Sequence, residues 1–164
     1  MTTPETTRDR EHADLVAGGV SIIVAGRDAA NETTVSRAVG CRMSEDGRRV
    51  TVFLSAVQSG ALLADVRANG RIAVVFSEPT THRAIQLKGT DAAIVPLTAD
   101  DPHLLAAYRS RLAARVAPLG FSEVFVRTLL NVVPGDVVAI AFTPTAAFSQ
   151  TPGPKAGSPL QSPA

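Results

Sequence analysis

The chain has 164 residues, of which 45% are hydrophobic and 19% are charged, so it is long enough for one globular domain with one hydrophobic core. Sixteen basic residues against fifteen acidic residues give a net charge of +1, and only 4% of the residues are aromatic, with no tryptophan. This composition argues against a nucleic-acid partner, which would need a basic surface or exposed aromatic side chains, and against attraction to an anionic membrane.

Residues 1–10 are polar and predict a loosely held N-terminus. They contain no basic stretch followed by an apolar one, so no signal peptide is expected, and no window reaches the roughly 18 apolar residues of a membrane-spanning helix. The single cysteine, Cys41, has no intramolecular partner for a disulfide, and its Val-rich surroundings favour a packing role over a nucleophile. These features predict a cytoplasmic protein.

In chain order, six segments rich in β-branched residues predict strands, at 20–25, 33–43, 50–54, 71–76, 82–95 and 137–142. Asp46-Gly47 has the chemistry of a hairpin turn between the second and third segments, and short linkers favour an antiparallel sheet. Gly89, inside the long fifth segment, predicts a bulge or a bend in that strand.

Helical spacing of apolar residues predicts four helices, over residues 9–17, 59–68, 101–116 and 122–130. Ser59 and Ser122 have the residue type that caps a helix at its start. Asn69-Gly70 predicts a left-handed end to the second helix.

The resulting fold class is mainly β with α, a six- to seven-stranded antiparallel split β-barrel with flanking helices over residues 11–150. Six strands of this length can close into a barrel and so remove exposed sheet edges. The segment 151–164 is rich in Pro, Gly and Ser and predicts a tail without regular structure. For residues 144–157 two hypotheses stay open, a disordered tail or an ordered arm laid over a partner subunit, and disorder is expected for 158–164.

The central part of the chain carries a diffuse but extended pattern. Its parts are TTVSRAVG at 33–40, TVFLS at 51–55, VRANGRIAVVF at 66–76 and HRAIQLKG at 82–89. Together they resemble the pyridoxamine 5′-phosphate-oxidase-like family, over roughly residues 15–95. The resemblance implies a split barrel, a homodimer and FMN bound at the subunit interface.

The resemblance also implies site residues on the strands. Arg37 matches the family's strand arginine near the flavin, where a guanidinium suits a phosphate or the ring. Ala38 and Val39 match positions that offer backbone groups to the ring. Ser55 stands where the third strand leads toward the cofactor phosphate, and Gln86 could form a hydrogen bond with a ring edge.

Ser59, Gly60 and Ala61 open the following helix, whose free backbone N–H groups are suited to an anion. Family members that hold FMN tightly carry a Ser-Arg-Lys-type cluster here, whereas this chain has Gly60, Ala61 and Leu62. A lost charge-assisted contact typically costs about 1.5–3 kcal/mol, so FMN is expected to bind weakly. For the same reason, true pyridoxamine-phosphate oxidase activity is not expected.

Two classes of function follow from these observations. The first is an FMN-dependent oxidoreductase whose substrate and catalytic residues are unknown. The alternative is a cofactor-free or weakly liganded dimeric binding protein on the same barrel, or one that uses another conjugated cofactor such as a deazaflavin or haem. His12, His82 and His103 lack the spacing of metal ligands, so no metal site is predicted.

Overall fold

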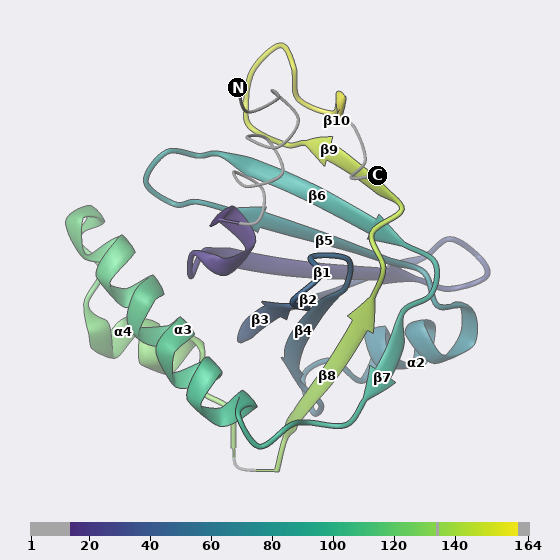
Figure 1. The fold of residues 1–164 in the computed structure, drawn as a ribbon, viewed down its shortest axis with the longest axis horizontal. Helices are drawn as coiled ribbons and strands as arrows, with labels where there is room; N and C mark the ends of the chain where they lie inside the picture. Colours follow the sequence, from purple (N-terminus) through teal and green to yellow (C-terminus); the bar gives the residue numbers. More distant parts are fainter. Residues whose placement is uncertain (1–13, 134, 161–164) are drawn as a thin grey trace.

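The computed structural model describes residues 14–133 and 135–160, and in these residues ten strands form two antiparallel sheets (Figure 1). The six-stranded sheet has the order β10-β9-β6-β5-β1-β2. Its strands are β1 (Ser21–Arg27), β2 (Thr33–Arg37), β5 (Ile72–Ser77), β6 (Ala84–Gly89), β9 (Ala146–Ser149) and β10 (Pro159–Leu160). The four-stranded sheet has the order β3-β4-β8-β7, with β3 (Gly40–Met43), β4 (Val50–Ser55), β7 (Ala93–Val95) and β8 (Val137–Phe142).

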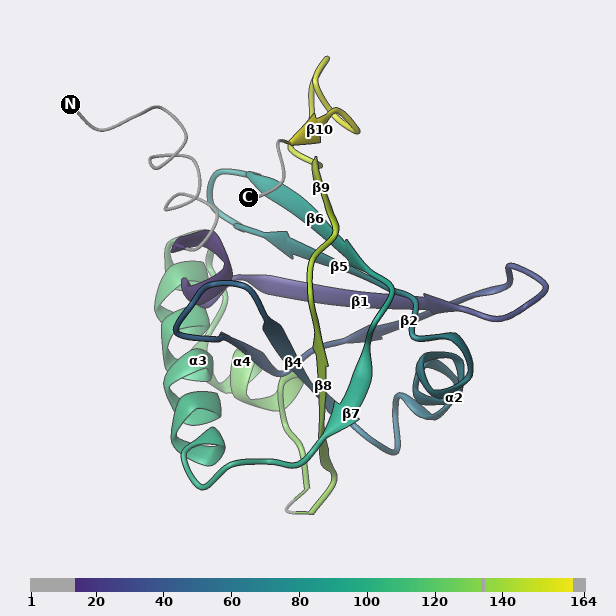
Figure 2. The same ribbon diagram turned by 45° about the vertical axis from the view of Figure 1, so that its right-hand side comes forward.

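The strands of the two sheets run in crossing directions and enclose one core (Figure 2). Alternate residues of β1 and β5 are buried, because one face of the six-stranded sheet points into the barrel. All six residues of β4 are buried, including Phe53 at its centre. The predicted class, an antiparallel split barrel with flanking helices, is confirmed.

The corners of the barrel divide two of the predicted strands. The segment 33–43 breaks into β2 and β3 between the two sheets: the Ala38 amide donates to Ile22 O of β1 at 3.0 Å, and the Val39 amide donates to Phe53 O of β4 at 2.8 Å. Two consecutive amides therefore bind different sheets. The prediction of one continuous strand over 33–43 was wrong, because the apolar, β-branched sequence continues through the corner without a change in pattern.

The second division follows Gly89, where β6 ends and the chain passes into β7 of the other sheet. A Cβ atom on Gly89 would lie 2.6 Å from Phe142 Cδ2 and 3.0 Å from Thr143 O. Only glycine lets β6 approach β8 this closely, so the bend predicted from Gly89 is confirmed.

The region after β8 forms strands within the same chain. β9 pairs with β6, with Gln86 opposite Phe148, and β10 pairs with β9. The expected disorder is therefore wrong for 146–149 and for 159–160, whereas contact of this segment with a partner subunit stays a prediction. The open edge of β6 offers unpaired backbone groups, and the proline at 144 precedes the ladder and so removes no donor from it.

The helices lie at two ends of the barrel (Figure 1). α2 (Gly60–Asn69) covers one end, and α3 (Asp101–Val116), the 3₁₀ turn η1 (Ala117–Leu119) and α4 (Glu123–Leu129) lie together at the other. Residues 14–17 are helical, and the rest of the first predicted helix lies outside the described residues. None of the helices described has the length and apolarity that crossing a bilayer requires.

The helix ends confirm two of the three predicted signals. Gly70 ends α2 at a φ of 64°, and the Ser122 hydroxyl accepts from the Phe125 amide at 3.1 Å at the start of α4. The Ser59 side chain, by contrast, makes no capping bond to α2, and its hydroxyl is buried with no partner among the described residues. The φ of −113° and ψ of 16° at Ser59 differ from the extended backbone that directs a capping side chain onto the first turn.

Candidate functional site

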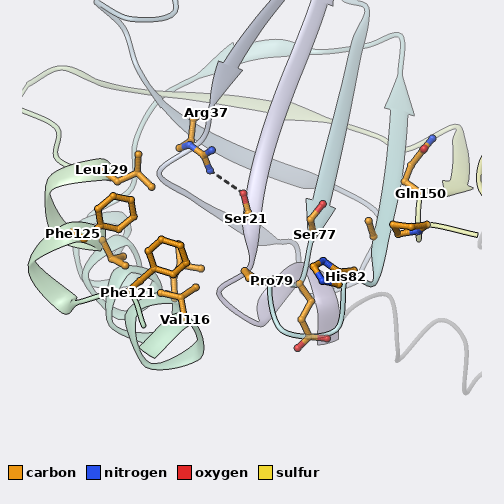
Figure 3. A pocket seen from close by; sticks show the side chains of 15 residues that line it. Ser21, Arg37, Ser77, Pro79, His82, Val116, Phe121, Phe125, Leu129 and Gln150 are labelled. Carbon is orange, nitrogen blue, oxygen red and sulfur yellow. Dashed lines mark hydrogen bonds between the residues drawn. The ribbon is translucent and has the colours of Figure 1, made fainter. Parts of the chain in front are cut away.

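A cleft of about 400 Å³ lies between α4 and one end of the six-stranded sheet (Figure 3). The sheet contributes the start of β1, the end of β2, the end of β5 and the start of β6, and the helices contribute an apolar wall. Its size falls in the range of small-molecule and cofactor sites. We call it the Arg37 cleft.

Arg37 is the last residue of β2, and its exposed guanidinium lies at the rim of the cleft. Its Nη1 donates to Ser21 Oγ of β1 at 2.9 Å, which orients the side chain across the cleft (Figure 3). Of the described carboxylates, none lies within ion-pair distance of this guanidinium. No described carboxylate therefore compensates the guanidinium, and most of its donors are available to a ligand.

The apolar wall consists of Phe121, Phe125 and Leu129, which face the Arg37 side of the cleft (Figure 3). These side chains remain 45%, 48% and 45% exposed. The two phenyl rings stack on each other with centroids 5.2 Å apart. Large apolar side chains that stay exposed together at a cavity are typical of a surface that a ligand or a partner covers.

The opposite side of the cleft is polar and carries little net charge. Glu78 forms an ion pair with Arg115 of α3, so its carboxylate is compensated within the chain. His82 lines the cleft from the β5–β6 turn, in left-handed backbone at a φ of 59°, and Gln150 lines it from the segment after β9. Over the described ranges, no three His, Cys, Asp or Glu side chains gather closely enough to hold a metal ion.

Gln86 shares a face of the sheet with Arg37. Arg37 is opposite Ile23, Ile23 is opposite Val75, and Val75 is opposite Gln86, so the four residues form one row across the outer face. Three strand spacings separate Arg37 from Gln86, about 14 Å. Gln86 is outside the cleft lining, and its part in a site stays a prediction.

Ala38 and Val39 are buried at the barrel corner, and both of their amides are used by the fold itself, as described above. Neither residue lines the cleft. Their predicted contact with a ring stays a prediction. Their N–H groups already donate within the fold and are not available to a ring.

Ser55, Ser59, Gly60 and Ala61 lie at the mouth of α2, and none of them lines the Arg37 cleft. The Ser55 hydroxyl donates to the Asp136 carboxylate and accepts from the Gln58 amide at 3.2 Å. The four residues stay a predicted site, one that the structure keeps apart from the cleft around Arg37.

Asp136 places a negative charge at this helix mouth. Its carboxylate also accepts from the Val57 amide at 2.9 Å. The Ser55 hydroxyl, and then the Val57 amide, hold the pKa of Asp136 below its ordinary value of 3.8, so the carboxylate is charged at neutral pH. A phosphate arriving here would meet a like charge, which weakens the fit of a phosphate-bearing cofactor at α2.

Sequence reasoning missed Phe121, Phe125 and Gln150 as cleft residues. Phe121, Phe125 and Leu129 follow one another at intervals of four, which predicts one apolar helix stripe. That signal does not distinguish a stripe packed in the core from one left at a cavity. No pattern in the sequence pointed to Gln150, because the pairing of β9 with β6 is what brings this residue to the cleft.

No family model matches the chain, and no curated protein matches it. Solved structures do resemble it. HupZ of Group A Streptococcus has a TM-score of 0.55 and 17% identity, over 96% of this chain and 100% of that one. A Clostridium acetobutylicum protein related to general stress protein 26, of the pyridoxinephosphate oxidase family, has a TM-score of 0.52 and 15% identity, over 90% and 89%.

A structure of an F420 reductase is similar too, with a TM-score of 0.51 and 15% identity over 82% of this chain and 93% of that one. At such identities the likeness establishes the architecture and no site. The chain has the split-barrel fold of the pyridoxamine-phosphate-oxidase-like proteins, and the predicted resemblance is confirmed at that level.

Proposed function

We propose that the protein is a flavin-binding oxidoreductase that holds its cofactor, FMN in the first instance, in the Arg37 cleft. The observation that carries this proposal is a guanidinium that has no carboxylate partner among the described residues, at the rim of a cleft whose other wall is a stacked, solvent-exposed phenylalanine pair. Charge on one side and flat apolar surface on the other suit a ligand that is anionic and conjugated at once.

The polar and apolar residues of the cleft would contact different parts of the cofactor. The Arg37 guanidinium would pair with the phosphate or with an electron-rich edge of the ring, since its fork of donors suits oxygen acceptors. Phe121, Phe125 and Leu129 would cover the ring and exclude water from it. A bound flavin supplies hydride and electron transfer, and the chain's own side chains orient it and admit the substrate.

Deazaflavin is the second candidate. It rests on one observation, that an F420 reductase shares the fold. A cofactor-free binding protein, or one that binds haem, remains the alternative that the experiment below separates.

We also propose that the protein is a homodimer that pairs through the outer face of its six-stranded sheet. That face presents Ile23 and Val75, half-buried in a single chain, and Val35, which is 61% exposed. The Arg37 cleft lies at the edge of this face, where a second copy would complete it.

Sedimentation of the native protein should give a dimer, and Val75→Lys should give a monomer. A wild-type monomer at micromolar concentration would reject this interface.

The function is tested by the colour and the bound content of the purified protein. We expect flavin-type absorption, and release of a flavin or deazaflavin on denaturation that mass spectrometry identifies. If the purified protein carries no cofactor, adding it to FMN should quench the fluorescence of FMN. Arg37→Ala and Phe125→Ala should each weaken binding about tenfold or more, since each removes one of the two walls.

Arg48→Ala is the matched control, because Arg48 is an exposed arginine in the β3–β4 hairpin, outside the cleft lining. Equal losses for Arg37→Ala and Arg48→Ala would show a general charge effect and reject the assignment of Arg37. Colourless protein that neither releases a conjugated ligand nor quenches FMN or F420 would support the cofactor-free alternative.

A further inference from the structure

A second cleft, of about 360 Å³, lies at the opposite end of the same sheet face. It is built where β1 ends, β2 begins, β5 begins and β6 ends, whereas the Arg37 cleft is built at the other end of each of these strands. We call it the basic cleft, after its polar lining, which consists of Arg27, Arg71, Lys88, Thr33, Thr90 and Thr145.

The shape of the basic cleft follows from the side chains in its floor. Ala25 is directly opposite Ala73, and Gly26 and Gly89 adjoin them. These residues rise little above the backbone, whereas the long side chains of the arginines and the lysine surround them. A hollow with a small-residue floor and basic walls admits a compact anion to within reach of several donors at once.

The two arginines lie at the same end of the sheet. Arg27 is the last residue of β1, Arg71 directly precedes β5, and both line the basic cleft. Asn69 holds both backbones: its Nδ2 donates to Arg27 O at 2.7 Å, and its Oδ1 accepts from the Arg71 amide at 2.8 Å. Two guanidinium groups that line one cleft repel each other, so this arrangement calls for a counter-charge.

The chain supplies little of that counter-charge. Within the described residues, no carboxylate lines the basic cleft, and no ion pair includes Arg27, Arg71 or Lys88. Arg27 donates to the side-chain oxygen of Asn31, a neutral group, and the Lys88 ammonium lies 4.8 Å from the centroid of the Phe148 ring. Three positive charges therefore share one hollow.

We propose that the basic cleft binds the phosphate or diphosphate group of a small molecule. Two guanidinium forks and an ammonium match the several charged oxygens of such a group, and the hydroxyls of Thr33 and Thr90 can donate to the remaining ones, whereas the Thr145 hydroxyl donates to Lys88 O. This site is separate from the Arg37 cleft and does not depend on the function proposed for it.

Calorimetric titration of the native protein with inorganic pyrophosphate at low ionic strength tests the proposal. We expect binding that Arg27→Gln and Arg71→Gln each weaken about tenfold or more, and Lys88→Gln by less. Arg48→Gln removes the same charge elsewhere and should leave the affinity unchanged. Repeating the titration with inorganic phosphate and with glycerol phosphate separates a free anion from an esterified one as the preferred ligand.

Thermal unfolding supplies a second readout that does not depend on any one variant. Pyrophosphate should raise the unfolding temperature of the wild type, and Arg71→Gln should remove that increase without lowering the unfolding temperature of the free protein, because it also relieves the repulsion from Arg27. Should Arg71→Gln fail to fold, Arg27→Gln and Lys88→Gln carry the same test. Absence of binding to the wild type, or an equal loss in Arg48→Gln, would overturn the proposal.

Discussion

The two sheets of the barrel divide stability and recognition between them. In the four-stranded sheet every residue of β4 is buried, and the last four residues of its neighbour β8 are buried as well. In the six-stranded sheet β1 and β5 alternate, so that half of their side chains point outward, and both clefts lie at the ends of that outward face. We expect substitutions in the first sheet to alter folding and substitutions on the outer face of the second to alter binding.

The largest expected effect is that of Phe142→Ala in β8, on stability. Phe142 is fully buried in the core, so the loss of contacts and the cavity should cost about 3–5 kcal/mol in the free energy of unfolding. Phe125→Ala is the comparison, since its ring is half-exposed at the Arg37 cleft and should change stability little while weakening ligand binding. Similar unfolding midpoints in denaturant for the two variants would contradict the division.

Gly89→Ala tests the corner where the two sheets meet. The added methyl group would lie against the Phe142 ring and the Thr143 carbonyl, and overpacking of this kind typically costs about 1–3 kcal/mol. Gly60→Ala is the matched control, because its new methyl group meets no atom within 4 Å at the start of α2. We expect Gly60→Ala to be neutral or to stabilise by up to about 1 kcal/mol. Equal denaturation midpoints would show that the corner tolerates a side chain.

Asp136→Asn tests the end of β4, where this fully buried strand leads to the start of α2. The pKa of Asp136 is lowered in the folded protein, so its contribution to stability is present above the ordinary value of 3.8 and is lost as the pH falls through the folded value. The variant should therefore be less stable than the wild type at neutral pH, and the difference should vanish in acid. Unfolding curves of the two proteins, recorded from neutral to acid pH, measure this difference.

The smallest expected effect is at Cys41 in β3, whose buried thiol donates to Val16 O at 3.0 Å. Burial raises the pKa of this thiol to about 12, so almost no thiolate exists at pH 8. A thiol reagent should leave the folded protein unlabelled and should label it once it is unfolded. Rapid labelling of the native protein would show that the four-stranded sheet opens more readily than its burial indicates.

The elements of this fold were largely predictable, and their breaks were not. Segments 71–76 and 137–142 became β5 and β8 within a residue, and 101–116 became α3 as predicted, because period and capping residues are local signals. The breaks at Ala38-Val39 and after Gly89 depend on which sheet the backbone joins next, and composition alone does not show that.

The candidate site shows the same limit. Arg37 was singled out from the sequence and does line a cleft, whereas Phe121 and Phe125, which form its other wall, lie more than eighty residues away along the chain. The basic cleft is made in the same way, from Arg27, Arg71 and Lys88 on three different strands.

By itself the sequence determined the period of each segment, the turns at Asp46-Gly47 and Gly70, and the class of the fold, because these follow from neighbours within a few residues. Only the tertiary structure decided which charges and rings face one another. The pairing of β1 with β5 brings Arg27 and Arg71 to one cleft, and the packing of α4 brings Phe125 to the cleft that Arg37 lines. Register and packing are settled by the burial of a common core, to which residues distant in the chain contribute together.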